Sequence, residues 1–400
     1  MAEAHQDVPA VPTVEVAELL PKLDGGEKIL ILDVRNDDEF AEWKLETRKP
    51  FETIHVPYFD FIEEAEGSIA KVPKGRDVVV LCAQGGSSEM VVDMLGEAGM
   101  PSRNIKGGMV AYGDFLDPVK VPLTAEEQAR FEIWQINRRG KGCLGYVVRS
   151  GLEAVVVDPA RHIGWYEAFV GKLGARIVRV LDTHVHADHV SGGPALRRKI
   201  GVPYFVASGE EFELKQDVTP LADGEELRLG GTPGVSIEVR ILKTPGHTPG
   251  STSYLVGGKY LLSGDTIFVA SVGRPDLGGH VVEWGQALFK TLKERIATLP
   301  DDVVVLPAHY ASLEEMRADG VVAGRLGDLR RNVPEMQIAT AEEFVEAVKA
   351  AVKTPPAAYT SMIKYNLGLL TADDEKIGEW ELGKNQCAAS AKKRMAIPTE

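Results

Sequence analysis

The fold is decided by the stretch Thr183-His184-Val185-His186-Ala187-Asp188-His189, which places three imidazoles and a carboxylate within six residues. Core packing does not call for such a cluster, whereas a metal ion does, because neutral histidine is the commonest metal ligand in proteins. The apolar residues 177–181 come just before it and predict a buried strand that runs into a loop, where α/β folds place their chemistry. The stretch therefore predicts a metal site, and a loop of surface histidines is the weaker alternative.

The composition is that of an ordinary globular protein with an acidic surface. The chain has 400 residues, 44% hydrophobic and 26% charged, which suits two or three domains with full cores. The net charge of −14 argues against nucleic acid and anionic membranes as partners. Three cysteines, Cys82, Cys143 and Cys387, make no disulfide framework and fit a reducing compartment. Residues 1–7 show no basic or apolar leader and no apolar run approaches ~18 residues, so we expect a cytoplasmic protein.

The first part of the chain reads as a small α/β domain. An opening helix is expected over residues 13–20, and buried strands over 29–34 and 78–81, the second of which ends at Cys82. Apolar residues at helical spacing between 91 and 98 predict a helix just after Cys82, and a glycine turn at 107–109 comes before another short helix. This pattern predicts a domain over residues 12–120, with a parallel sheet covered by helices on both faces.

From Arg130 the pattern changes to early hairpins followed by α/β units. Helices are expected over 163–173 and 192–200. Strands are expected over 131–136, 144–148, 154–157, 177–182, 203–206, 237–242, 252–256, 259–263 and, as the last one, 303–306. We therefore expect two mixed sheets packed together with helices outside, over residues 129–340. Residues 341–400 would form a helical extension whose last fifteen residues are poorly packed.

Three further metal-type residues stand downstream, each at the end of an apolar strand. They are His247 in Thr244-Pro245-Gly246-His247, Asp265 in Leu262-Ser263-Gly264-Asp265 and His309 in Leu306-Pro307-Ala308-His309. Proline and glycine fix the backbone around each, so that the side chains can be held rigidly against an ion. A lone histidine would be a weak signal, but the ordered set is a strong one.

The ordered set resembles the metallo-β-lactamase fold over about residues 130–310. That resemblance implies an αββα sandwich with the metal in a cleft between the sheet edges. In dinuclear hydrolases of this superfamily, one metal is held at the positions of His184, His186 and His247. The other is held at the positions of Asp188, His189 and His309, and the position of Asp265 bridges the two.

One branch of that superfamily fits more closely, because Gly273-Arg274-Pro275-Asp276 resembles an element of the persulfide dioxygenases, which are related to glyoxalase II. The resemblance implies one Fe(II) per chain at His184, His247 and Asp265, a facial triad with open positions for substrate and O₂.

The remaining motif residues, His186, Asp188, His189 and His309, would then shape the pocket and position water, with Asp188 as a catalytic candidate. Arg274 would hold a substrate carboxylate or orient Asp276. A purely structural salt bridge between Arg274 and Asp276 is an equally supported alternative. Tyr310 stands where that family has an acid and is kept as a substrate contact.

A second chemical motif is Cys82-Ala83-Gln84-Gly85-Gly86-Ser87-Ser88, which runs from a strand into a helix. In such a loop, backbone N–H groups that point inward and the helix N-terminus stabilise a thiolate and a bound anion. The alternative is that Cys82 is a buried structural cysteine.

Residues 12–118 resemble a single-domain rhodanese, a sulfurtransferase. The resemblance rests on Leu32-Asp33-Val34-Arg35, His55-Val56-Pro57, the Cys82 loop and Lys106-Gly107-Gly108-Met109. It implies a persulfide on Cys82 and substrate contacts from Gly85, Gly86, Ser87 and Ser88. Ser87 replaces an arginine frequent in that family, and Ser88 stands where a phosphatase of the same fold needs arginine.

Together the two resemblances imply a bifunctional enzyme that oxidises glutathione persulfide to sulfite with Fe(II) and O₂, while Cys82 exchanges sulfane sulfur with thiosulfate or sulfite. One alternative is a hydrolase of a thioester with two Zn(II) ions, and another is a rhodanese unit that acts only as a sulfur sensor or docking module. Tyr359, Met362 and Asn366 would belong to a closing segment and a homodimer contact. Cys143 is expected in the core, and Cys387 has no assigned role.

Overall fold

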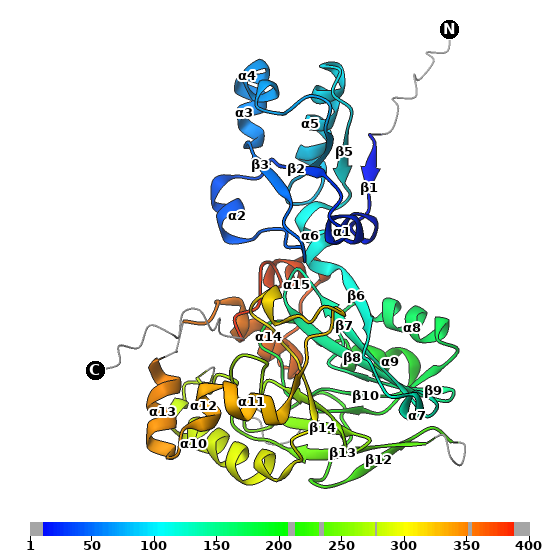
Figure 1. Cartoon of the computed structure of the whole chain (residues 1–400), viewed down its shortest axis with the longest axis vertical. Helices are drawn as coiled ribbons and strands as arrows, with labels where there is room; N and C mark the ends of the chain where they lie inside the picture. The colour runs from blue at the N-terminus through cyan, green and yellow to red at the C-terminus, as the bar shows by residue number, and fades with distance from the viewer. Residues whose placement is uncertain (1–10, 207–212, 232–235, 277, 351–353, 388–400) are drawn as a thin grey trace. The chain divides into compact units, whose positions relative to one another are not determined.

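The computed structural model describes residues 11–206, 213–231, 236–276, 278–350 and 354–387 (Figure 1). It divides into two compact units, one formed by residues up to Phe115 with Arg139–Lys141, and the other by Leu116–Arg138 with the chain from Gly142 onward. The expected helical extension after residue 340 belongs to the second unit. No described helix is long and apolar enough to cross a membrane.

The first unit is built on a five-stranded parallel sheet in the order β1-β5-β4-β2-β3. The strands are β1 Thr13–Val14, β2 Ile29–Asp33, β3 Glu52–His55, β4 Asp77–Leu81 and β5 Ser102–Ile105. The helices are α1 Val16–Gly25, α2 Asp37–Glu42, α3 Tyr58–Glu63, α4 Ala65–Ala70, α5 Gly86–Glu97 and α6 Gly108–Asp114.

Both faces of this sheet are buried, because β2 and β4 are continuous apolar runs. Alternate residues of these strands enter two apolar clusters, one that includes Leu19 of α1 and Tyr112 of α6, and one that includes Phe61 of α3 and Val91 of α5. The prediction of helices on both faces is confirmed. The predicted opening helix was placed too early, because the β-branched Thr13 and Val14 pair with Asn104 and Ile105 of β5.

The second unit contains two six-stranded sheets, with strand orders β11-β10-β9-β8-β7-β6 and β12-β13-β14-β15-β16-β17. The first has β6 Leu116–Lys120, β7 Glu132–Arg138, β8 Cys143–Ser150, β9 Glu153–Val157, β10 Arg176–Leu181 and β11 Tyr204–Phe205. The second has β12 Glu226–Leu229, β13 Ile237–Lys243, β14 Thr252–Val256, β15 Tyr260–Gly264, β16 Val304–Pro307 and β17 Gly324–Arg325.

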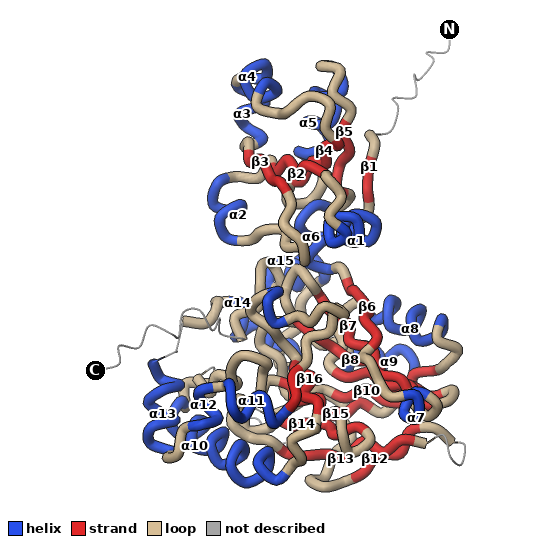
Figure 2. Tube along the Cα trace, viewed as in Figure 1, coloured by secondary structure: helices blue, strands red, loops and turns tan. Residues whose placement is uncertain are grey.

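Helices flank the two sheets, as Figure 2 shows. They are α7 Ala125–Gln128, α8 Ile163–Lys172, α9 Gly193–Ile200, α10 Val281–Lys290, α11 Leu326–Asn332, α12 Pro334–Gln337, α13 Ala341–Ala350, α14 Ala358–Asn366 and α15 Asp374–Trp380. One apolar cluster joins residues of both sheets, a second packs the first sheet against α8 and α9, and a third packs the other sheet against α10 and α13. The layers are therefore αββα, and the predicted fold is confirmed.

Six short strands were not predicted: β1, β3 and β5 in the first unit, and β6, β12 and β17 in the second. β6 contains Pro118, which lacks an N–H group and weakens the sequence signal, yet an edge strand tolerates it. β17 pairs only Gly324 and Arg325 with β16, so β16 is not the last strand, as had been expected. The expectation of a poorly packed tail covers residues 386–400, of which 388–400 lie outside the described part of the chain, while Cys387 within it is buried.

Candidate metal centre

The second unit gathers its polar motif residues where strands end. The His184–His189 loop follows β10, His247 follows β13, Asp265 follows β15 and His309 follows β16. Gly264 at the end of β15 has φ 55°, and a Cβ there would lie 2.7 Å from Thr183 Oγ1. The glycine before Asp265 is thus required by the close approach of the two loops.

His184, His247 and Asp265 bring three donor atoms together within 4.8 Å of one another. Asp265 Oδ2 lies 3.8 Å from His184 Nε2 and 3.4 Å from His247 Nε2. Both His184 Nε2 and Asp265 Oδ2 are buried and have no hydrogen-bond partner among the described residues. Buried polar atoms are normally satisfied, so converging unpartnered donor atoms fit a metal cation.

The tautomers of the two histidines also fit ligation. His247 Nδ1 donates to the carbonyl oxygen of Arg274 at 2.8 Å, which leaves the lone pair on Nε2. His184 Nδ1 lies 3.0 Å from Thr183 Oγ1, whose hydroxyl is within 3.1 Å of Asp158 Oδ1. Since that hydroxyl donates to the carboxylate, it accepts from His184 Nδ1, and the Nε2 lone pair again faces the triad. Burial lowers the pKa of both histidines, so both rings are neutral.

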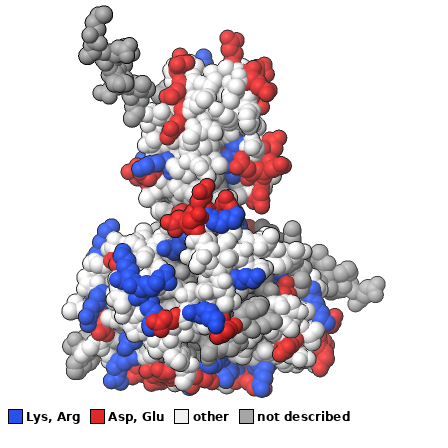
Figure 3. Space-filling view, turned by 180° about the vertical axis from the view of Figure 1, so that it is seen from behind, with Lys and Arg blue, Asp and Glu red and all other residues white. Residues whose placement is uncertain are grey.

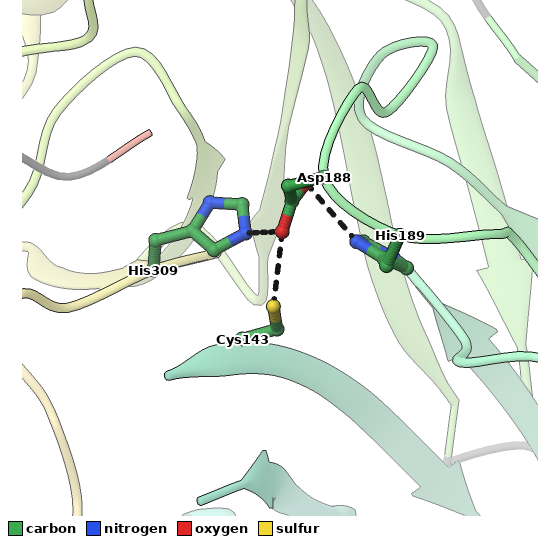
Figure 4. A group of neighbouring side chains, drawn as sticks. All are labelled: Cys143, Asp188, His189 and His309. Atoms are coloured by element: carbon green, nitrogen blue, oxygen red, sulfur yellow. Dashed lines mark hydrogen bonds and ion pairs between the residues drawn. The ribbon is translucent and has the colours of Figure 1, made fainter. Parts of the chain in front are cut away.

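A second cluster, drawn in Figure 4, adjoins the first through His309, whose Nδ1 lies 2.6 Å from Asp265 Oδ1. Asp188 Oδ2 lies 2.9 Å from His309 Nε2 and accepts from the Cys143 thiol at 3.0 Å, while Asp188 Oδ1 lies 3.2 Å from His189 Nδ1. These four residues also form a group that could hold an ion. In contrast to the triad, its donor atoms are hydrogen-bonded to one another.

The charges of this cluster follow from its contacts. Burial opposes the charge on Asp188, but His309 and His189 beside it hold its pKa well below the ordinary value. Burial likewise opposes protonation of His189, but Asp188 raises the pKa of His189 to about 10. The same carboxylate, together with Asp265, holds the pKa of His309 well above its ordinary value despite burial. The cluster is a buried carboxylate between two imidazolium groups.

His186 contributes no donor atom to the triad, although it belongs to the same motif and its ring centroid lies 4.3 Å from that of His184. Its Nε2 lies 3.1 Å from Asp158 Oδ1, and its donor atoms group with Asp158 and Asp182. Asp158 follows β9 with φ 48°, the one positive φ of a described non-glycine residue. The sequence showed Asp158 only as an acid at the end of a buried strand, and its role in orienting both Thr183 and His186 was missed.

Arg274 and Asp276 form a buried two-point ion pair. Arg274 Nε donates to Asp276 Oδ1 at 2.8 Å and Nη2 donates to Asp276 Oδ2 at 2.6 Å, while Nη1 donates to the carbonyl oxygen of Gln386 at 3.1 Å. Tyr310 is 1% exposed, and its hydroxyl lies 3.1 Å from Asn137 Oδ1. The guanidinium is thus engaged by the protein itself, and Tyr310 is packed in the sheet core.

Two buried residues of the extension hold the backbone of the histidine loop: Asn366, which was expected only as part of a closing segment, and Glu381, which no sequence pattern indicated. Asn366 Nδ2 donates to the carbonyl oxygens of His186 and His189 at 2.8 and 2.9 Å, and Asn366 Oδ1 accepts from Ser191 N at 3.0 Å. Glu381 Oε1 accepts from Val190 N at 2.7 Å. The expected closing segment is therefore in direct contact with the candidate site.

The two cysteines of this unit also lie at the site. Cys143 is buried, as expected, but contacts Asp188, because its strand forms a β-bridge with His309. Cys387 is buried, and its sulfur lies within 4.8 Å of donor atoms of Asp265 and His309. Burial raises the pKa of the Cys387 thiol, so it is protonated.

In the first unit, the Cys82 loop folds around the sulfur. Cys82 Sγ accepts from Gly85 N and from Ser88 Oγ, each at 3.0 Å. Gly85 has φ 108°, and a Cβ on Gly108 would lie 2.3 Å from the carbonyl oxygen of Cys82, so glycines are required on both sides of the loop. Ser88 Oγ also lies 2.6 Å from Asn104 Oδ1. Gly86 and Ser87 begin α5 beside the sulfur.

Two family models match the chain. The metallo-beta-lactamase superfamily matches residues 138–309, and the rhodanese-like domain matches residues 15–114. A hydroxyacylglutathione hydrolase of Haemophilus ducreyi is 30% identical over 186 residues, which is 46% of this chain and 73% of that protein. The human mitochondrial persulfide dioxygenase ETHE1 is 30% identical over 166 residues, 40% of this chain and 60% of that one.

Solved structures share the fold. A metallo-beta-lactamase from Staphylococcus aureus has a TM-score of 0.54 at 24% identity and covers 60% of this chain and 73% of its own. ETHE1 from Myxococcus xanthus has a TM-score of 0.51 at 24% identity and covers 59% and 98%. The predicted resemblances are confirmed: the chain belongs to the metallo-beta-lactamase superfamily and carries a rhodanese-like domain ahead of that fold.

Proposed function

We propose that this enzyme oxidises glutathione persulfide to sulfite and glutathione at one Fe(II) held by His184, His247 and Asp265, and that Cys82 transfers sulfane sulfur. The observation that carries the proposal is the convergence of those three donor atoms within 4.8 Å, with two of them buried and unpartnered among the described residues. Two imidazoles and one carboxylate leave open positions on an iron for substrate and O₂. One O₂ and one water would supply the three oxygens of sulfite.

The surrounding residues support a single ion. His309 Nδ1 lies 2.6 Å from Asp265 Oδ1, so only Oδ2 of that carboxylate is left for a metal. Bound iron would supply the site for the persulfide sulfur and O₂. Asp188 and His309, buried beside the triad, would hold a proton near the sulfur that leaves as glutathione.

We also propose a role for Arg274 and Asp276 that their geometry supports. Because the guanidinium already makes three hydrogen bonds to Asp276 and Gln386, we assign it to holding the Gln386 backbone rather than a substrate carboxylate, while the backbone carbonyl of Arg274 holds the His247 ring. For Tyr310, the hydrogen bond to Asn137 favours packing over substrate contact.

In the first unit, the Cys82 thiolate would attack the outer sulfur of thiosulfate and release sulfite. A thiol acceptor would then attack the outer sulfur of the Cys82 persulfide and restore the thiolate. Gly85 N and Ser88 Oγ, both 3.0 Å from Cys82 Sγ, would stabilise the sulfur anion in each step.

The test is O₂ uptake and sulfite release by iron-loaded protein with glutathione persulfide. We expect His184→Ala to lose iron and uptake, and Cys82→Ser to keep uptake while losing sulfur transfer from thiosulfate. Protein that holds one iron per chain and consumes no O₂ would overturn the dioxygenase proposal.

A second candidate is a thioester hydrolase with two zinc ions, because Asp188, His189 and His309 lie within 4.8 Å of one another next to Asp265. Elemental analysis separates the two: one iron per chain supports the dioxygenase, and two zincs with hydrolysis of S-lactoylglutathione support the hydrolase.

A further inference from the structure

We propose that Cys82 passes its sulfane sulfur to a cysteine of a basic partner protein, which docks on an apolar and acidic surface formed by α3 and α5. We call this surface the α3–α5 patch and define it by Phe59, Ile62 and Met90 with the acidic Glu63, Glu89, Asp93 and Glu97. The inference rests on the proposed sulfur transfer through Cys82 and adds the identity of its acceptor class.

The apolar residues of the patch are exposed and lie on two helices that pack against each other. Phe59, Ile62 and Met90 are 58%, 54% and 47% exposed. Phe59 and Ile62 lie three residues apart on α3, α3 packs against α5, and the Tyr58 hydroxyl lies 3.4 Å from Met90 Sδ. The other large exposed apolar residues of the described chain stand singly at Leu152, Ile200, Val282, Leu369 and Leu382. Scattered apolar residues are normal, whereas a cluster marks an interaction site.

The patch leads directly to the reactive sulfur. α5 begins at Gly86, four residues after Cys82, and its exposed side runs through Gly86, Met90, Asp93 and Glu97. Cys82 is only 4% exposed, but a persulfide would extend it outward by one S–S bond of about 2.05 Å. A partner protein bound to the exposed side of α5 can therefore bring its thiol to the Cys82 loop. A small thiol can reach that loop without contacting the patch.

The acidic residues around the apolar centre determine which partner proteins are complementary to the patch. Neither α3 nor α5 contains a lysine or arginine, and together they carry Asp60, Glu63, Glu89, Asp93 and Glu97. Of these, Asp60 is within 3.5 Å of Lys71. Residues 11–115 contain 20 acidic and 11 basic residues, a net −9 of the chain's −14. Acidic side chains also outnumber basic ones on the face of this unit shown in Figure 3. A partner with apolar residues ringed by lysine or arginine is complementary to this surface, and an acidic one is repelled.

The experiment loads Cys82 of the full chain with thiosulfate labelled at its outer sulfur and measures release of the label to three acceptors. These are a cysteine peptide of about twelve residues rich in leucine and lysine, its glutamate counterpart, and dithiothreitol. We expect the basic peptide to react about tenfold faster than the acidic one at low salt, and the difference to shrink at high salt.

Variants locate the effect. Glu63→Lys with Asp93→Lys, and separately Phe59→Ser with Ile62→Ser, should remove most of the preference for the basic peptide and leave loading and transfer to dithiothreitol unchanged. Glu18→Lys is the charge control, because α1 packs on the opposite sheet face from α5. Equal rates with both peptides would overturn the docking proposal alone. No label on Cys82 after thiosulfate would overturn the sulfur-transfer function, and the docking proposal with it.

Discussion

His309 Nδ1 lies 2.6 Å from Asp265 Oδ1, so one oxygen of this carboxylate is held by an imidazole while the other faces His184 and His247. His309 also binds Asp188 through Nε2 at 2.9 Å. One ring therefore joins the candidate iron triad to the charged cluster beside it, and it fixes how Asp265 can bind an ion.

Replacing His309 should weaken the metal site without removing a proposed ligand. We expect His309→Ala to lower iron affinity about 10- to 100-fold, because Asp265 loses the partner that orients it. Chelator competition followed by elemental analysis measures this. Tyr310→Phe, which removes only the hydroxyl near Asn137, is the neighbouring control and should keep the affinity. Unchanged affinity in His309→Ala would show that Asp265 orients itself.

Asn366→Ala should destabilise the histidine loop from a distance. The change leaves the carbonyl oxygens of His186 and His189 and the N–H of Ser191 without their buried partner. We expect a loss of about 1–3 kcal/mol in the free energy of unfolding, together with lower metal content. Urea unfolding and elemental analysis check both, and exposed Asn332→Ala on α11 should change neither. A stable variant that binds less metal would assign Asn366 to the site alone.

The metal-free chain should lose stability in alkali because of His189. Asp188 raises the pKa of His189 to about 10, against an ordinary value of 6.5, so the folded state binds the proton more tightly than the unfolded one. That contribution is complete below pH 6.5 and is lost as the pH rises toward 10, by at most about 1.4 kcal/mol per pH unit. Urea unfolding between these limits should show a shallower decline in His189→Gln. Parallel curves for the two proteins would contradict the assignment.

Ser88→Ala should slow sulfur transfer from thiosulfate. The change removes the hydroxyl that lies 3.0 Å from Cys82 Sγ, and a hydrogen bond to a charged group is worth about 1.5–3 kcal/mol, roughly a 10- to 150-fold loss in rate. Ser87→Ala, one residue earlier and closer to solvent, should cost much less. Initial rates with thiosulfate and a thiol acceptor measure the difference. A larger loss in Ser87→Ala would reverse the roles of the two serines.

Sequence patterns predicted the fold because most strands of each sheet are apolar runs that can be recognised in the amino-acid sequence. They also predicted that His184, His247, Asp265 and His309 meet, since each follows such a run. They could not predict the contact between the His186 ring and Asp158, because this contact depends on the backbone of Asp158, whose φ is 48°. Hydrogen-bond partners far apart in the chain leave no local pattern, and strands as short as β1 and β17 are too brief for a period to appear.

The contact between Glu381 and the histidine loop also constrains how the protein is made. Glu381 binds Val190 N across 191 residues of sequence. At about 5–20 residues per second, a ribosome needs roughly 10–40 s to add that stretch. The histidine loop therefore emerges long before the residues that hold it, and its final geometry belongs to the last phase of synthesis. A chain that stopped before α14 would present the metal-binding motif in a loop that lacks its hydrogen bonds to Asn366 and Glu381.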